Sequence, residues 1–322
     1  MVPSGELERF RTDLDALIDT GTRFGVAVSG GPDSLALLLL AAAARPGEVA
    51  AATVDHGLRE GSREEAEAVA DICERLDVPH AILVVEWDIP PGSAIQEKAR
   101  DVRYGVLASW MQEYGFSSLT TAHHLDDQAE TLMMRLNRGA GVRGLAGMRP
   151  LASVPGHPDL RLARPLLTWR QANLAAVCAA AGVRPFADPS NEDARHERVR
   201  IRRALSQADW LDPEAFARSA SNLADADDAV EWAAAMEWNR FATFGDGEVA
   251  YRPSSAPPEI VRRIVARAIE ELGTEGEPDD LRGRELNRVI AQLEAGRTAT
   301  LRGVRCQGGA EWSFKRARPR SR

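Results

Sequence analysis

The first half of the chain alternates short apolar runs with longer stretches of helical periodicity, and this alternation restricts the fold more than any other feature. The short runs predict four strands, at residues 24–29, 50–54, 81–85 and 118–122. The longer stretches predict the helices that follow them, at residues 35–44, 64–76, 95–114 and 125–136. Such an alternation builds a parallel sheet with helices on both faces. We therefore expect a doubly wound α/β domain, whose ligands bind in the segments directly after the strands.

The rest of the chain is predicted to be mostly helical. Residues 138–165 are rich in Gly, Pro and Arg and predict an irregular basic loop. Helices are predicted at residues 168–181, 213–241, 257–272 and 281–295, with a further Arg-rich helix after a turn at 188–191. A small hairpin, residues 298–304 and 310–314 joined through Gly308 and Gly309, precedes a basic tail at 315–322. We place the domain boundary so that a larger domain, residues 1–208, precedes a smaller, mainly α-helical domain, residues 209–322.

Composition excludes several classes of protein. With 322 residues, 44% hydrophobic and 27% charged, the chain should form ordinary cores rather than a disordered or collagen-like structure. Its longest apolar run, residues 35–44, is too short to cross a bilayer, and the polar N-terminus does not resemble a secretory signal. The three cysteines are far apart and include no C-x-x-C pair, which is typical of a reducing compartment. We expect a soluble cytoplasmic protein without a membrane partner.

Charge is segregated along the chain, although the net charge is −8. Seven arginines and one acidic residue lie between Arg135 and Arg170, and five arginines and one acidic residue lie between Arg195 and Arg203. Only Lys98 and Lys315 are lysines, which codon bias of a GC-rich genome explains most simply. Guanidinium groups also bind phosphate and stack on bases, so these stretches are candidate nucleic-acid contacts despite the acidic total.

The sequence SGGPDS, residues 29–34, lies directly between a predicted strand and a predicted helix. Its glycines permit a tight turn with exposed N–H groups, and the helix start adds unpaired N–H groups and partial positive charge. Such a loop is shaped to hold phosphate or pyrophosphate, although it lacks the lysine and the spacing of a Walker A loop. A plain strand–helix turn is the structural alternative.

A second polar segment, HHLDDQAET at residues 123–131, follows the fourth predicted strand. If a helix begins near Leu125, the three carboxylates of Asp126, Asp127 and Glu130 crowd its first turns. They could hold Mg²⁺, bind a substrate ammonium or accept a proton. Acidic capping of a helix start is the structural alternative.

Two further segments have ordinary structural explanations when taken alone. Asp55 and His56 follow the second predicted strand and suit a turn that caps a helix. Arg100 and Arg103 share one face of a predicted helix, which suits a solvated face or, as the alternative, a phosphate contact.

Together these segments resemble a known family. SGGPDS is similar to the loop of the N-type ATP pyrophosphatases, the PP-loop superfamily with the adenine nucleotide alpha-hydrolase-like fold, which split ATP to AMP and pyrophosphate. Other segments resemble one branch, the tRNA(Ile)-lysidine synthetases: VDHGLR at 54–59, ARDVRY at 99–104, TAHHLDDQAETLMMRLNRGAGVRGLAGM at 121–148, RPLL at 164–167 and DPSNED at 188–193. The resemblance is strong over residues 20–205. The chain departs from the family at Val199, where an Asn often follows the first arginine, and lacks room for the further C-terminal domain of longer members.

The resemblance implies a reaction and a set of substrates. ATP would adenylate C2 of the wobble cytidine in the isoleucine tRNA with a CAU anticodon, and free L-lysine would then displace AMP to give lysidine. Mg²⁺ would assist, and a homodimer is one option for assembly to which no residue points.

The resemblance also implies site residues. Those that would bind ATP are Ser29, Gly30, Gly31, Pro32, Asp33, Ser34 and His56. The catalytic candidates are Asp33, which would also hold Mg²⁺, together with His123, Asp126, Asp127 and Glu130. The candidates for tRNA contact are Arg100, Arg103, Arg195, Arg198 and Arg202.

Three other functions compete with this one. A tRNA 2-thiolation enzyme would use the same loop but usually needs paired cysteines, which the sequence lacks. A metal-dependent phosphoesterase would use the His and Asp cluster but would leave the SGGPDS loop without a role. A catalytically inactive RNA-binding module would not need Asp33, Asp126, Asp127 and Glu130.

Overall fold

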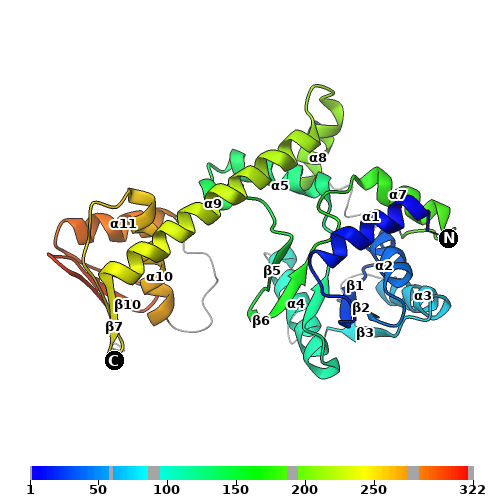
Figure 1. The fold of residues 1–322 in the computed structure, drawn as a ribbon, viewed down its shortest axis with the longest axis horizontal. Coiled ribbons are helices and arrows are strands. Elements are labelled where there is room, and N and C mark those ends of the chain that lie inside the picture. Colours follow the sequence, from blue (N-terminus) through cyan, green and yellow to red (C-terminus); the bar gives the residue numbers. More distant parts are fainter. Residues whose placement is uncertain (1, 58–60, 86–94, 187–194, 274–282, 318–322) are drawn as a thin grey trace. The chain divides into compact units, whose positions relative to one another are not determined.

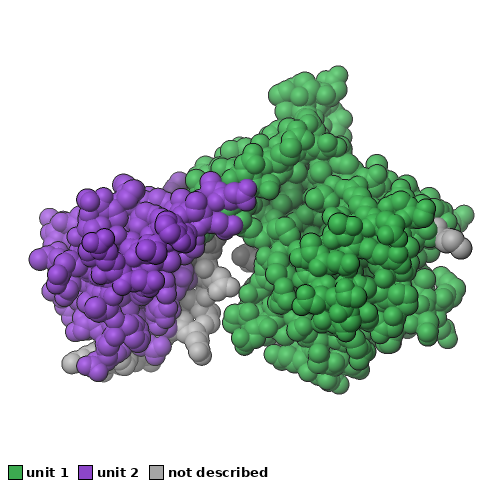
Figure 2. All heavy atoms as spheres, viewed as in Figure 1, with its two compact units in different colours: residues 1–224 green, residues 225–322 purple. Residues whose placement is uncertain are grey.

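The computed structural model describes residues 2–57, 61–85, 95–186, 195–273 and 283–317, with only the backbone described for 95–97. The chain divides into two compact units, residues 1–224 and 225–322, which are coloured separately in Figure 2. The division falls within helix α9 (Pro213–Phe241), which contributes residues to both units. The predicted boundary at 208/209 lies between α8 (Glu197–Gln207) and α9, and it stays a prediction.

The first unit contains a six-stranded sheet in the order β3-β2-β1-β4-β6-β5 (Figure 1). Its strands are β1 (Phe24–Ala27), β2 (Val49–Asp55), β3 (His80–Val84), β4 (Ser118–Thr120), β5 (Leu151–Val154) and β6 (His157–Ala163). Pairing is parallel from β3 to β6, and β5 pairs antiparallel with β6 at the edge. The expected parallel α/β sheet and its four predicted strands are confirmed.

Helices cover both faces of this sheet, as the pattern predicts. The helices before α8 are α1 (Ser4–Asp15), α2 (Pro32–Ala44), α3 (Ser62–Arg75), α4 (Ile95–Tyr114), α5 (Leu125–Asn137), α6 (Val142–Leu145) and α7 (Gln171–Ala180). Of these, α2, α3 and α4 pack on the strands, α1 and α7 pack against α2, and α5 packs against α6 and α8. Side chains alternate along a strand, so Val49 and Ala51 of β2 pack in the core with α2 and α7, whereas Ala50 and Ala52 pack in the core with α4. The parallel sheet is therefore buried on both sides.

One part of the sequence prediction for the first unit is wrong. Residues 138–165 contain α6, β5 and β6 rather than an irregular loop. Along β6 the buried Leu160 and Leu162 alternate with the exposed Asp159 and Arg161, which is the pattern of a strand. The turn at Gly156 and the proline at position 158 interrupt the sequence signal on which the strand prediction depends. As a result β6 joins β4 and extends the sheet.

Helix α1 also lies outside the sequence prediction. Its Phe10 packs edge-on against Trp169, with ring centroids 6.5 Å apart, and both side chains are fully buried. The Trp169 indole N–H donates to Asp13 Oδ2 at 2.8 Å. These contacts attach α1 to the segment just before α7.

The second unit combines helices with an antiparallel sheet. Its remaining helices are α10 (Pro258–Leu272) and α11 (Gly283–Glu294), and its strands are β7 (Ala242–Gly245), β8 (Glu248–Tyr251), β9 (Thr298–Leu301), β10 (Val304–Gln307) and β11 (Trp312–Arg316). The strand order is β7-β8-β11-β10-β9. The first predicted run of the hairpin is divided in two, because Arg302 and Gly303 have φ values of 47° and 69° and form a tight turn. No helix in the described part of the chain has both the length and the apolar character needed to span a membrane.

The β10–β11 connection depends on glycine at position 308. A Cβ atom added there would lie 2.0 Å from the carbonyl oxygen of Leu293 at the end of α11, and the Gly308 N–H already donates to Arg297 O at 2.9 Å. We predict that Gly308→Ala lowers the free energy of unfolding by about 3 kcal/mol, because backbone must move to relieve the clash. Urea unfolding followed by circular dichroism measures this, with Gly283→Ala as the control, since no described residue beyond its own helix and its chain neighbours lies within 4 Å of its added Cβ. Equal midpoints for the two variants would contradict the prediction.

Candidate active site

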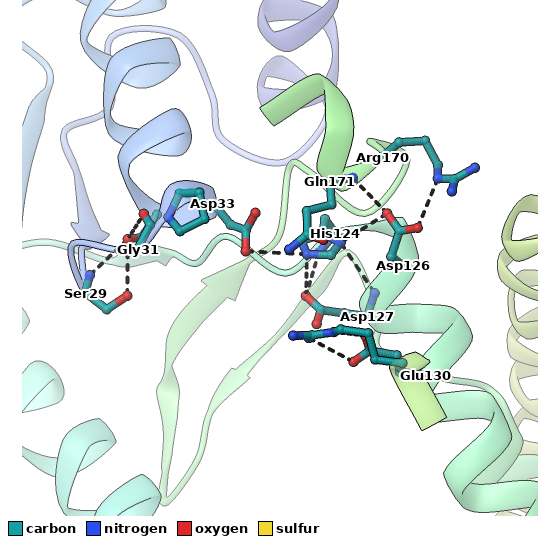
Figure 3. Close-up of polar contacts among 12 residues, drawn as sticks. Ser29, Gly31, Asp33, His124, Asp126, Asp127, Glu130, Arg170 and Gln171 are labelled. Atoms are coloured by element: carbon teal, nitrogen blue, oxygen red, sulfur yellow. Dashed lines mark hydrogen bonds and ion pairs between the residues drawn. The ribbon is translucent and has the colours of Figure 1, made fainter. Parts of the chain in front are cut away.

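The SGGPDS loop connects β1 to α2 and is held by its own serines (Figure 3). Ser34 Oγ accepts a hydrogen bond from the Ser29 N–H at 3.1 Å and donates to the Gly31 carbonyl at 3.0 Å, while the two serine hydroxyls lie 3.2 Å apart. Gly31 is the N-cap of α2 and Pro32 follows in its first turn, so no side chain of the cap covers the helix start. The unpaired N–H groups of this helix start suit a phosphate.

Gly30 cannot be replaced without strain in this loop. Its φ is +80°, and an added Cβ would lie 3.0 Å from the ring of Phe186. The Phe186 N–H donates to the Gly30 carbonyl at 3.0 Å. The backbone of the loop is thus packed against a segment more than 150 positions later in the chain.

The HHLDD segment lies beside this loop because β4 pairs directly with β1, Gly25 opposite Leu119. His124 is the N-cap of α5, and it exchanges hydrogen bonds with Asp127 in a capping box. The imidazole is 2% exposed and lies among three carboxylates, 3.6 Å from Asp33, 3.6 Å from Asp126 and 3.5 Å from Asp127. Burial lowers the pKa of His124, but the neighbouring carboxylates of Asp33, Asp127 and Asp126 outweigh burial and raise it above its usual value.

Asp126 is fully engaged by the start of α7. Its Oδ1 accepts from Arg170 Nε at 3.0 Å, and its Oδ2 accepts from the Gln171 backbone N–H at 2.8 Å. Asp127 differs, since only its Oδ2 accepts a hydrogen bond, from the His124 N–H at 3.1 Å. Within the described residues, Asp127 Oδ1 is therefore available to a ligand.

Glu130 is buried and engaged by α8. Its carboxylate accepts from Arg202 Nε at 2.6 Å and Arg202 Nη2 at 3.2 Å, and Arg198 Nε lies 3.4 Å away. Burial raises the pKa of Glu130, and the hydrogen bond from Arg202 offsets this only in part. Arg198 and Arg202 remain partly exposed, at 43% and 36% of their side-chain surface.

A positive cluster lies on the other side of the histidine pair. Burial, together with the charges of Arg164, Arg100 and Arg103, lowers the pKa of His123 to about 3. His123 Nδ1 forms a hydrogen bond with the Thr121 hydroxyl at 2.9 Å. Burial and the charge of Arg103 also lower the pKa of His56. The two neighbouring histidines therefore lie in opposite electrostatic surroundings. His123 lies near arginines, and His124 lies among carboxylates.

The structure brings most of the predicted site residues to one edge of the sheet. Asp33 of the loop lies beside His124 together with Asp126 and Asp127, and the charge of Asp127 acts on Glu130. The charges of Arg100 and Arg103 act on His123, and that of Arg103 also acts on His56. Arg198 and Arg202 contact Glu130, whereas the backbone carbonyl of Arg195 accepts from Arg200 Nη1 at 2.9 Å. The DPSNED segment at 188–193 and residues 58 and 59 of VDHGLR lie outside the described residues.

Sequence reasoning assigned no role to His124, Arg164 or Arg170. His124 was visible as half of a histidine pair, and Arg164 begins the RPLL motif, so both had a sequence signal. Arg170 was counted only within the basic stretch 135–170, and its contact with Asp126 had no sequence signal because it spans 44 positions.

Asp33 is the residue that fits a metal ion best. Its Oδ1 is buried and forms no hydrogen bond with the described residues. No group of three or more His, Cys, Asp or Glu side chains with metal-binding geometry occurs among those residues. Mg²⁺ commonly uses one or two carboxylates together with substrate phosphates, so one free carboxylate oxygen beside a phosphate loop suits it.

The cysteines are unsuited to thiol chemistry. Cys73, Cys178 and Cys306 are buried and unpaired. Burial raises the pKa of Cys73 and Cys306 to about 12 and that of Cys178 to about 11, so the reactive thiolate is suppressed. This disfavours the thiolation reaction considered from the sequence.

Comparison with known proteins agrees with this geometry. The family model described as the PP-loop domain matches residues 6–209, which contain the sheet and both polar segments. The tRNA(Ile)-lysidine synthase of Novosphingobium aromaticivorans is 48% identical over 316 residues, 98% of this chain and 94% of that protein. The enzyme of the same name from Zymomonas mobilis is 40% identical, over 98% of this chain and 96% of its own length. The chain belongs to the tRNA(Ile)-lysidine synthase family of PP-loop proteins.

A solved structure shares the fold at greater distance. The U34-tRNA thiolase NcsA from Methanococcus maripaludis, solved with a [4Fe-4S] cluster, superposes with a TM-score of 0.55 and 16% sequence identity. The match covers 70% of this chain and 77% of that one, and it concerns the fold alone.

The neutral state of His123 predicts a pH dependence of stability. Its usual pKa of 6.5 falls to about 3 on folding, so its contribution to stability is complete above pH 6.5 and is lost as the pH falls toward 3. We predict that His123→Asn flattens the acid side of the stability profile by about 1 kcal/mol per pH unit. Urea unfolding of both proteins between pH 7 and pH 4.5 measures the slopes, and parallel profiles would contradict the prediction.

Proposed function

We propose that the protein forms lysidine at the wobble cytidine of the isoleucine tRNA with a CAU anticodon. ATP adenylates the C2 oxygen of the cytidine and releases pyrophosphate, and the ε-amine of free lysine then attacks C2 and expels AMP. The observation that carries this proposal is the juxtaposition of a phosphate loop with a carboxylate cluster around His124. The relatives named tRNA(Ile)-lysidine synthase support the same reaction.

The loop would hold the phosphates of ATP. Its helix start supplies N–H donors and partial positive charge, which would stabilise the negative charge that develops as pyrophosphate leaves. Asp33 would repel these phosphates unless a cation lies between them, and its free Oδ1 suits Mg²⁺. When bound, Mg²⁺ would offset the charge of the leaving pyrophosphate.

Free lysine would bind at the carboxylate side of the site. A pocket of 300 Å³ lies there, lined among others by Asp126, Glu130, Arg170, Arg202 and Asp209. Its volume is at the lower end of the range for small-molecule pockets, as an amino acid requires. The two arginines suit a carboxylate group, and the carboxylate of Asp209 suits an ammonium group.

Asp127 is the best candidate to accept the proton of the lysine ammonium. The amine becomes nucleophilic only after that proton leaves. Asp126 and Glu130 have both oxygens bound by protein donors, so among the described residues only Asp127 Oδ1 of these three carboxylates accepts no hydrogen bond. Asp126 would instead position the start of α7, and Glu130 would position Arg198 and Arg202.

The tRNA would be held by basic side chains at the rim of the site. Arg100, Arg103 and Arg195 are the proposed backbone contacts, since phosphate contacts set the position of the nucleic acid. Arg198 and Arg202 contact Glu130 with only some of the five N–H donors that each guanidinium carries, and both remain partly exposed. Each could therefore hold Glu130 and contact the tRNA backbone at the same time.

Incorporation of labelled lysine tests the reaction. We predict ATP-dependent label in the isoleucine tRNA with the CAU anticodon and none in methionine tRNA, which shares the anticodon. Asp33→Ala should lower the rate at least about 100-fold, because it removes the carboxylate that would hold the cation offsetting the charge of the leaving pyrophosphate. Label without ATP, or full activity of the variant, would contradict the proposal. Cleavage of ATP to AMP without label would support ATP binding by the loop but would indicate a nucleophile other than lysine.

A pair of variants tests the assignment of the proton acceptor. We predict that Asp127→Asn slows lysine transfer at least about 100-fold at neutral pH while adenylated tRNA still accumulates, because only the second step needs the base. The matched variant Asp126→Asn should mainly lower thermal stability, since it weakens the cap on α7. Quenched reactions that separate adenylated tRNA from lysidine product measure both steps. An equal loss of both steps in Asp127→Asn would reject this role.

A further inference from the structure

Three arginines of the first unit gather without a carboxylate partner among the residues that the structure describes. The guanidinium carbons of Arg100 and Arg103 lie 5.1 Å and 5.4 Å from the ring centroid of Tyr104. The charges of both, and that of Arg164, act on His123. None of the three forms an ion pair with a described residue. We call Arg100, Arg103, Tyr104 and Arg164 the arginine pocket.

Two polar atoms of this pocket are buried without a hydrogen-bond partner among the described residues, Arg164 Nε and the Tyr104 hydroxyl. Arg164 is 8% exposed and Tyr104 1% exposed. Arg164 Nη1 donates a hydrogen bond to the Arg149 carbonyl at 2.7 Å, and this bond holds the guanidinium in place. Buried donors of this kind require an explanation, and a guanidinium edge suits two oxygens of a phosphate.

The pocket is separate from the SGGPDS loop. Arg164 follows β6, the loop follows β1, and β4 lies between these two strands. At the usual strand spacing the two strand ends are roughly 10 Å apart. This separation favours a phosphate that is not part of the pyrophosphate held by the loop.

We propose that the arginine pocket is a second phosphate site and that it binds a phosphodiester of the RNA substrate. The proposal rests on the proposed function for the identity of the RNA, and it adds Arg164 and Tyr104 to the residues that bind it. A phosphodiester held here would fix the target nucleotide between the pocket and the loop, beside the uncharged ring of His123. The pocket would therefore orient the nucleotide, while the loop orients ATP.

Binding measurements on the full chain test this site. We predict that Arg164→Met raises the Kd for the CAU isoleucine tRNA about tenfold and lowers the slope of log Kd against log salt by about 1, as loss of one phosphate contact does. The Kd for a non-hydrolysable ATP analogue should stay within about twofold. Arg161→Met is the matched control, because the Arg161 side chain is exposed and, among the described residues, donates to the Leu17 carbonyl at 3.3 Å.

Each outcome decides between the alternatives. Unchanged tRNA affinity and salt slope in Arg164→Met would overturn the proposal, and a raised Kd for the ATP analogue alone would assign the pocket to ATP instead. If Arg164→Met does not fold, Tyr104→Phe keeps the ring and removes only the hydroxyl, and it should still weaken tRNA binding severalfold. An unchanged Kd in Tyr104→Phe would then overturn the proposal. Weaker binding by the variants, with no lysine transfer by the wild-type protein, would preserve the pocket and reject the proposed reaction.

Discussion

The parallel pairing of β1 with β4 is the constraint on which the site depends. Parallel strands end at the same edge of a sheet, so the SGGPDS loop after β1 and the HHLDD segment after β4 meet although about 90 residues separate them. The pairing also aligns the starts of α2 and α5, whose partial positive charges favour anions at the same place. Neither segment alone forms the site, since Asp33 from one and His124 from the other make its central contact.

Charge is divided across this edge by two consecutive residues. Successive side chains of an extended backbone point in opposite directions, and His124 has φ −127° and ψ −179°. His124 therefore lies among carboxylates while His123 lies among arginines, and their pKa values move in opposite directions. One half of the site suits a cation and the other half suits phosphate. A reaction that joins an ammonium-bearing substrate to a polyanion needs both halves within reach of one atom.

The sequence predicts the parts of the site that depend on local pattern. The loop, the four strands and the cluster of Asp126, Asp127 and Glu130 follow from residue type, spacing and position after a strand. The division of labour among these carboxylates does not follow, because their partners Arg170, Gln171 and Arg202 come 44 to 72 positions later. Strand β6 is missed for a different reason, since Gly156 and Pro158 interrupt the pattern that would have indicated it.

The contact between Asp126 and the start of α7 has a consequence for the entropy of binding. A side chain near the start of α5 supplies both the acceptor for the Gln171 N–H and the partner of Arg170. The two helix starts are thereby joined across the wall of the 300 Å³ pocket. The loop before α7 therefore loses its conformational freedom when the chain folds, and it has none left to lose when a ligand binds. The entropy cost of ordering this wall is therefore part of the free energy of folding. It does not reduce the affinity for a small, flexible substrate.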